Sequence, residues 1–348
     1  MITRRSTWHA VRLFALLLVV LLLFLVFRRI GFLNILRAIS HIPPLPITSA
    51  VLLFLTVFLL WCLRWLHFLR PAAGMNMLTV FPVYMAGVFV NIITPGARVG
   101  GEPVRAYYMS RIFGGEKSRY LGTVLADKLA YATVFLGFLI LSVFFVVIFV
   151  PLAMPYKVVL AGIVLLIVVA VVSGVLLRHQ IGVRSGLLGK LLPVLYEGRL
   201  MKFIRRRFPT YEHFEEYAIG KLDNLVNPAI RAAGSPRALA LVFTLSVVSW
   251  LLVCLAHHVL FAALGADISF PRVLVIVTIS TFFGDISMSP GGAGFMEAAM
   301  LGLCAAFGLD SRTAAAVTVL SRGLFYLCGL GLGGVCLAAL SAIFGRRD

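Results

Sequence analysis

The stretch SPGGAGFMEA, residues Ser289 to Ala298, sets three glycines, a proline and a carboxylate inside a strongly apolar part of the chain. Glycine and proline interrupt helices, and an ionised side chain is costly in hydrocarbon. If this part of the chain lies in a membrane, the stretch predicts a broken helix whose charge has a specific partner or function.

The composition indicates that the surrounding solvent is a bilayer. The chain has 348 residues, of which 61% are hydrophobic and 13% are charged. Soluble globular domains contain fewer apolar residues, and several runs here are long enough to cross roughly 30 Å of hydrocarbon as helices. We predict an all-α polytopic membrane protein with about six full spans plus two re-entrant helical hairpins arranged as an inverted repeat. The expected spans are about 10–27, 47–69, 121–150, 156–177, 237–263 and 312–344.

The basic residues predict the orientation in the membrane. The net charge is +18, and residues 178–237 hold 11 of the 31 Lys and Arg, whereas the connections 151–157 and 265–272 hold one each. Because basic loops stay on the cytoplasmic side, we expect this loop and both termini to be cytoplasmic in a multi-pass cell (inner) membrane protein. Nucleic acid is not an expected partner, since no binding motif accompanies the charge.

Two shorter apolar stretches run directly into Pro-Gly clusters. The segment 271–288 is followed by only fifteen residues, 294–308, which is short for a complete crossing. The segment 78–93 is followed by PGARVGGEPVRAYYMSR, which is too polar to return across a whole bilayer. We interpret 78–111 and 271–308 as re-entrant hairpins, although 78–93 could instead span fully. The re-entrant placement leaves three basic residues on the outer side, against five for the full crossing.

The two clusters have the same spacing. Thr94-Pro95-Gly96 leads to Glu102, seven residues after its proline, and Ser289-Pro290-Gly291 leads to Glu297, seven residues after its own. In the expected layout the span before the first hairpin runs inward and the span before the second runs outward. This pattern predicts an inverted repeat with broken helices near the midplane, as in many transporters.

The matching continues into the helices that follow. Asp127 lies twenty-five residues beyond the first glutamate, and Arg322 lies twenty-five beyond the second, with Lys128 supplying the cation in the first half. We therefore divide the chain into a first membrane half, 1–150, and a second membrane half, 151–348, which includes the basic loop.

These motifs carry a family resemblance over nearly the whole chain. PGARVGGEPVRAYYMSR with Asp127-Lys128, and SPGGAGFMEAAM with Arg322, resemble the flippase-like family typified by the transmembrane region of lysylphosphatidylglycerol synthases. The family usually has an acidic residue followed by Arg at the position of Asp127-Lys128, so Lys128 departs from the family's pattern. The resemblance implies a module that moves lipids between leaflets. The soluble aminoacyl-transferase domain of the synthases does not follow in this sequence, so we expect no enzyme activity, and lysyl transfer would need a separate lipid-synthesis enzyme.

The glycines permit close backbone approach, and the free N–H groups of a returning half-helix favour an anion such as a lipid phosphate. The predicted headgroup-binding residues are Pro95, Gly96, Arg98, Gly100, Gly101, Glu102, Arg105, Ser289, Pro290, Gly291, Gly292, Gly294, Glu297 and Arg322. The predicted charge partners are Asp127, Lys128 and Asp285. Three alternatives stay open for individual residues. Glu297 and Arg322 could form a purely structural pair, Arg105 could be a cation at the cytoplasmic surface, and Arg64 could mark the inner end of its span.

The predicted function is transport of a phospholipid or another anionic polar lipid between leaflets, with no metal or cofactor. The alternatives are a membrane-embedded transferase acting on polyprenyl-phosphate-type lipids and a non-transporting scaffold of a lipid-synthesis complex. We also expect the cysteines to act as apolar packing residues and the glycines Gly329, Gly331, Gly333 and Gly334 to permit close helix packing.

Overall fold

The computed structural model describes residues 40, 42–69, 75–94, 100–150, 154–155, 158, 162, 210–220, 235–287 and 289–344. Its main elements are helices, in the order α3 (Pro44–Leu69), α4 (Met77–Ile93), α5 (Gly101–Phe113), α6 (Lys117–Phe149), α11 (Pro236–Ala263), α12 (Phe270–Ile286), η2 (Pro290–Gly292), α13 (Phe295–Ala306) and α14 (Ser311–Phe344). The all-helical fold class is thereby confirmed for the described part of the chain.

Four helices are long and apolar enough to cross a membrane, namely α3, α6, α11 and α14. Even the shortest has 26 residues and is therefore about 39 Å long at 1.5 Å per residue. They confirm the expected spans 47–69, 121–150, 237–263 and 312–344, each with a start one to four residues earlier. The expected spans 10–27 and 156–177 lie outside the described residues. The chain is thus a multi-pass membrane protein.

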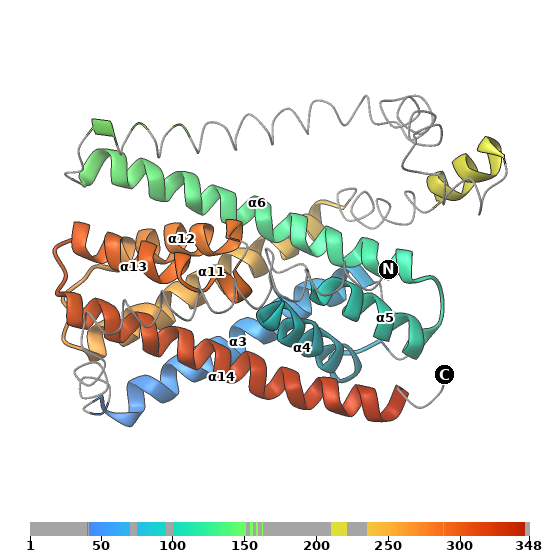
Figure 1. Ribbon diagram of the computed structural model, residues 1–348, viewed down its shortest axis with the longest axis horizontal. Coiled ribbons are helices and arrows are strands. Elements are labelled where there is room, and N and C mark those ends of the chain that lie inside the picture. The colour runs from blue at the N-terminus through green and yellow to red at the C-terminus, as the bar shows by residue number, and fades with distance from the viewer. Residues whose placement is uncertain are drawn as a thin grey trace, which may run out of the picture.

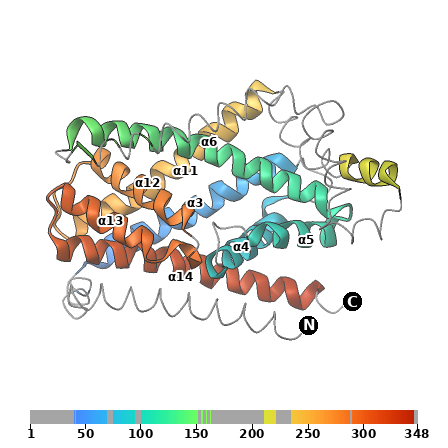
Figure 2. The same cartoon turned by 45° about the horizontal axis from the view of Figure 1, so that its top comes forward.

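Short helices form two pairs between the long ones. The first pair is α4 and α5, with 17 and 13 residues, and the second is α12 and α13, with 17 and 12 residues. The pairs lie toward opposite ends of the bundle's long axis (Figures 1 and 2). A capping box fixes the start of α4, the first helix of the first pair. The Asn76 side chain accepts a hydrogen bond from the Thr79 N–H, and the Thr79 hydroxyl accepts one from the Asn76 N–H.

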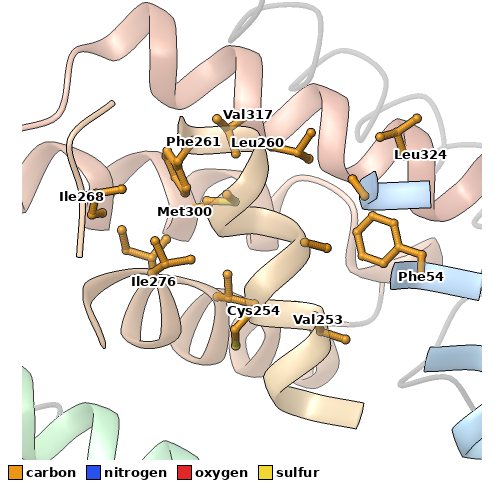
Figure 3. Close-up of a cluster of buried hydrophobic side chains, with 14 of the residues drawn as sticks. Phe54, Val253, Cys254, Leu260, Phe261, Ile268, Ile276, Met300, Val317 and Leu324 are labelled. Carbon is orange, nitrogen blue, oxygen red and sulfur yellow. The ribbon is translucent and has the colours of Figure 1, made fainter. Parts of the chain in front are cut away.

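The largest apolar core lies where α3, α11, α12, α13 and α14 meet. Phe54 from α3, Ile276 from α12 and Met300 from α13 are almost fully buried there (Figure 3). Cys254 and Cys304 belong to this core, and each of the five cysteines is a free thiol, as expected of packing residues. This core holds the second pair of short helices against the long helices.

Glycines bring α14 against α4. A Cβ atom added to Gly333 would lie 2.6 Å from the Met85 carbonyl oxygen, and one added to Gly329 would lie 2.6 Å from the Ile92 side chain. These contacts confirm close packing at both positions. At Gly331 no described residue lies within 4 Å of the added atom, so the described part of the structure gives no close contact there. Gly331 is on the exposed face of α14.

Candidate functional site

Three buried charges from three helices form the first part of the site. Arg64 of α3 donates from Nε to Asp127 Oδ1 of α6 over 2.6 Å and from Nη1 to the Ser246 hydroxyl of α11 over 3.2 Å. Arg105 of α5 places Nη1 3.8 Å from Asp127 Oδ2. All three charged residues are less than 5% exposed. One carboxylate therefore neutralises part of the charge of two guanidinium groups.

The second part ties the start of α5 to its neighbours. Lys128 Nζ lies 2.6 Å from Glu102 Oε1, and Asn91 Nδ2 donates to the same oxygen over 3.3 Å. The Asn91 side-chain oxygen accepts a hydrogen bond from the Gly101 N–H over 2.7 Å. The last residues of α4 thus satisfy one of the backbone donors at the N-terminus of α5.

The third part is the break between α12 and α13. Arg322 of α14 donates from Nε to Glu297 Oε1 over 2.8 Å, while Glu297 Oε2 accepts from the Gly294 N–H over 2.6 Å. Arg322 Nη2 also donates to the Gly291 carbonyl over 2.8 Å, and the Tyr326 hydroxyl donates to the same carbonyl over 3.0 Å. The predicted Glu297–Arg322 pair is confirmed, and it fixes the loop to α14.

The two breaks come together inside the bundle. Gly291 has φ +58°, a left-handed conformation that favours glycine, and an added Cβ would lie 2.6 Å from the Tyr326 hydroxyl and 3.5 Å from the Ile92 carbonyl oxygen. Ile92 is near the C-terminal end of α4. The turn after α12 therefore contacts both α14 and the end of α4.

A partly open cavity of about 120 Å³ lies between the charged groups. Its walls come from α3, α4, α5, α6 and α14 and from the turn between α12 and α13. Its lining residues are Trp61, Arg64, Tyr84, Val88, Asn91, Ile92, Arg105, Asp127, Lys128, Tyr131, Gly291, Arg322, Phe325 and Tyr326. Among the described residues, four cationic side chains line it, and three carboxylates, those of Asp127, Glu102 and Glu297, are paired with them. This balance leaves one excess positive charge, which favours an anionic ligand.

The structure brings together many of the residues predicted from the sequence. Arg105, Asp127, Lys128, Gly291 and Arg322 line the cavity. The surface alternative for Arg105 is wrong, since this residue is 4% exposed. The glutamates Glu102 and Glu297 are bonded to lining residues, and Gly101 and Gly294 carry the capped N–H groups.

Other predicted residues lie behind the cavity wall or outside the described part. Gly100 and Gly292 pack against Thr94 and Gly284, and the Ser289 hydroxyl bonds with that of Ser287 over 2.8 Å. Pro290 begins the turn, and Asp285 is half-buried at the end of α12 without lining the cavity. The predicted residues Pro95, Gly96 and Arg98 lie outside the described residues.

Sequence reasoning missed three members of the site. Arg64 is buried in the charge cluster rather than marking a helix end. The signal for it in the sequence was a lone arginine inside the apolar run 47–69. Asn91 is the lone amide in the apolar helix α4, and Tyr326 lies one helical turn after Arg322. Lys128, predicted to supply the cation of the first half, bonds to Glu102, as Arg322 bonds to Glu297 in the second half.

No group of three metal-ligating side chains is present among the described residues. The charged donors of the site are mainly arginine guanidinium groups, which recognise anions such as phosphate.

Comparison with known proteins agrees with this membrane architecture. Residues 12–333 match the family described as "Lysylphosphatidylglycerol synthase TM region". The chain belongs to this family. Similar proteins include a UPF0104 membrane protein of Pyrococcus horikoshii, 28% identical over 83% of this chain and 85% of the relative. A UPF0104 membrane protein of Methanocaldococcus jannaschii is 26% identical over 88% of each chain, and one of Methanothermobacter thermautotrophicus is 25% identical over 82% of each. Family membership is consistent with a lipid-related membrane role.

Proposed function

We propose that this protein is a flippase-like transporter that moves a phospholipid or another anionic polar lipid between the leaflets of the cell membrane. The observation that carries the proposal is the cavity with one excess positive charge among the described residues, lined by the first pair of short helices and by Gly291 of the turn that joins the second pair. A phosphodiester headgroup is a monoanion of matching charge, and its acyl chains would remain in the surrounding lipid. Family membership supports a lipid as the ligand.

The proposed mechanism treats the two pairs of short helices as re-entrant hairpins of an inverted repeat. Their positions toward opposite ends of the bundle support this assignment (Figure 1). So does the matching of their ion pairs, because each hairpin glutamate bonds to a cation on the next long helix, Glu102 to Lys128 and Glu297 to Arg322. Rocking of one half against the other would open the cavity to each leaflet in turn.

Individual residues would have separate tasks in this cycle. Arg105 and Lys128 would neutralise the phosphate, and Glu102, Glu297 and Arg322 would hold the hairpin loops. Glu297 accepts a hydrogen bond directly from the Gly294 N–H. Glu102 is linked to the Gly101 N–H through the side chain of Asn91. The capped N–H groups of these two glycines would not serve as phosphate donors without rearrangement. The side chains therefore carry the binding.

The proposed orientation has both termini in the cytoplasm, so the basic loop would attract anionic lipids of the inner leaflet. We assign the protein transport and not lipid modification. Any modification of the transported lipid would come from a separate lipid-synthesis enzyme.

Leaflet exchange in liposomes tests the proposal. Purified protein should accelerate exchange of fluorescently labelled phosphatidylglycerol, read by quenching of the outer leaflet, and Glu297→Gln or Arg322→Ala should abolish the acceleration. Wild-type protein that is folded and leaves the exchange rate at that of empty liposomes would overturn the proposal. Association with a lipid-synthesis enzyme without exchange would favour the scaffold instead.

A further inference from the structure

Two arginines line the same cavity but differ in how many partners they have. The guanidinium of Arg322 is saturated: Nε donates to Glu297, Nη1 contacts the Met296 sulfur at 3.0 Å, and Nη2 donates to the Gly291 carbonyl and contacts the Tyr326 hydroxyl. Each nitrogen already has a protein partner. Binding a phosphate through Arg322 would require breaking the contacts that hold the loop.

Arg105 is equally buried and much less satisfied. Its Nε has no hydrogen-bond partner among the described residues, and its Nη1 is 3.8 Å from Asp127, too far for a hydrogen bond. The other carboxylate oxygen of this residue, Asp127 Oδ1, accepts a hydrogen bond from Arg64 Nε at 2.6 Å. A buried guanidinium with unmade hydrogen bonds is costly unless a ligand completes them.

The surroundings hold Arg105 in place for such a ligand. Its guanidinium lies 3.8 Å from the centre of the Tyr84 ring and 5.5 Å from that of Trp65. Gly87 makes room for it, because a Cβ added there would lie 2.6 Å from Arg105 Nε and 2.7 Å from its Cγ. Stacking on aromatic rings fixes the plane of the guanidinium and leaves its edge for a bidentate partner.

We propose that Arg105 is the residue that anchors the phosphate group of the ligand, and that Arg322 is a positioning residue that ties the second hairpin to α14. This inference rests on the proposed function and divides its cationic residues into two roles. The ligand chemistry it assigns to Arg105 is a phosphate oxyanion, which lipid headgroups and free phosphate share.

Binding in detergent tests the inference without requiring transport. The probes are dihexanoyl-phosphatidylglycerol, inorganic phosphate and the phosphate-free dihexanoylglycerol, measured by calorimetry on the full-length protein. Arg105→Gln should raise the Kd of the phosphatidylglycerol probe by about 10- to 100-fold, the loss expected for charge-assisted hydrogen bonds. Binding of dihexanoylglycerol should be weak in wild type and unchanged by this substitution. Arg272→Gln, which removes an exposed cation at the start of α12, should leave the Kd unchanged.

A second variant displaces Arg105 without removing its charge. Gly87→Ala should push the side chain out of position and raise the same Kd, whereas Gly137→Ala, with nothing within 4 Å of its added Cβ, should not. Arg322→Gln should lower the thermal midpoint and change the Kd less than Arg105→Gln does. The comparison of Gly87→Ala with Gly137→Ala separates a binding role from a general effect of replacing a glycine. The comparison of Arg105→Gln with Arg272→Gln separates it from a general effect of removing a charge.

The outcomes distinguish this inference from the proposed function. Folded Arg105→Gln and Gly87→Ala proteins that bind the lipid probe like wild type would overturn the inference, even if wild type exchanges lipid. Wild type that binds the probe through Arg105 but exchanges no lipid would overturn the transport function and leave the anchor. Tighter binding of inorganic phosphate than of the lipid probe would support the anchor and identify free phosphate as the ligand.

Discussion

Glu297→Gln should remove more stability than an ordinary carboxylate-to-amide change. The two carboxylate oxygens of Glu297 accept from different donors, Arg322 Nε at 2.8 Å and the Gly294 N–H at 2.6 Å. A glutamine supplies one carbonyl oxygen, so its NH₂ group would face the other donor. Glu297 and Arg322 are 9% and 8% exposed, so the guanidinium would stay buried without its counter-charge.

The magnitude follows from these contacts. Loss of one charge-assisted hydrogen bond costs about 1.5–3 kcal/mol, and breaking a buried pair by removing one partner costs about 3–5 kcal/mol. We expect Glu297→Gln to lower the free energy of unfolding by about 3 kcal/mol. In a double-mutant cycle with Arg322→Gln, the coupling energy should be about 2–3 kcal/mol.

The assay is reversible unfolding in mixed micelles, with both single variants, the double variant and a matched control. The control is Asp310→Asn, an exposed carboxylate that caps α14 through the N–H groups of Arg312 and Thr313. It should cost less than about 0.5 kcal/mol, since Asn and Asp cap helices about equally well. Single-variant losses that simply add in the double variant would refute the assigned pair.

Three further substitutions test other parts of the site. Asp127→Asn leaves two buried guanidinium groups facing a neutral amide, and the free energy of unfolding should fall by about 3–5 kcal/mol. Gly291→Ala forces an added Cβ to 2.6 Å from the Tyr326 hydroxyl at φ +58°, and a lower thermal midpoint and slower lipid exchange should follow. Gly333→Leu should drive α14 away from a backbone carbonyl of α4 and destabilise the protein in a thermal melt, while Gly331→Leu, whose added Cβ has no described residue within 4 Å, should not. A wild-type melt for Gly333→Leu would contradict the packing.

The long helices were predictable because hydrocarbon imposes a simple length rule. Apolar runs identified all four of the described spans, but α3 begins at Pro44 and α6 at Lys117, before the apolar residues begin. Hydropathy detects only the apolar part of a helix, whereas backbone hydrogen bonding continues into polar turns such as Lys117–Tyr120. Proline is also well tolerated in the first turn of a helix.

The partners within the site were only partly predictable. Equal spacing identified Glu297 and Arg322, which bond across twenty-five residues. The same spacing identified Asp127 and its neighbour Lys128 in the first half but not their separate partners, because neighbouring helix residues point in different directions. Asp127 faces Arg64 of α3, while Lys128 reaches Glu102 of α5.

Arg64 shows where reasoning from one segment stops. An arginine near the end of an apolar run usually extends to the membrane surface. Here the end of α3 passes beside α6 and α11, so the side chain finds Asp127 and Ser246 in the interior. Only the packing of these three helices decides between the two positions.

The capped N–H groups of Gly101 and Gly294 have a consequence for the permeability of the membrane. A polar opening in a bilayer tends to recruit water, and a continuous file of water lets protons and ions leak. At both breaks the protein's own side chains, Asn91 and Glu297, occupy backbone donors that would otherwise hold water. The resting protein can therefore keep a charged cavity in the membrane interior with less risk to the ion gradients of the cell.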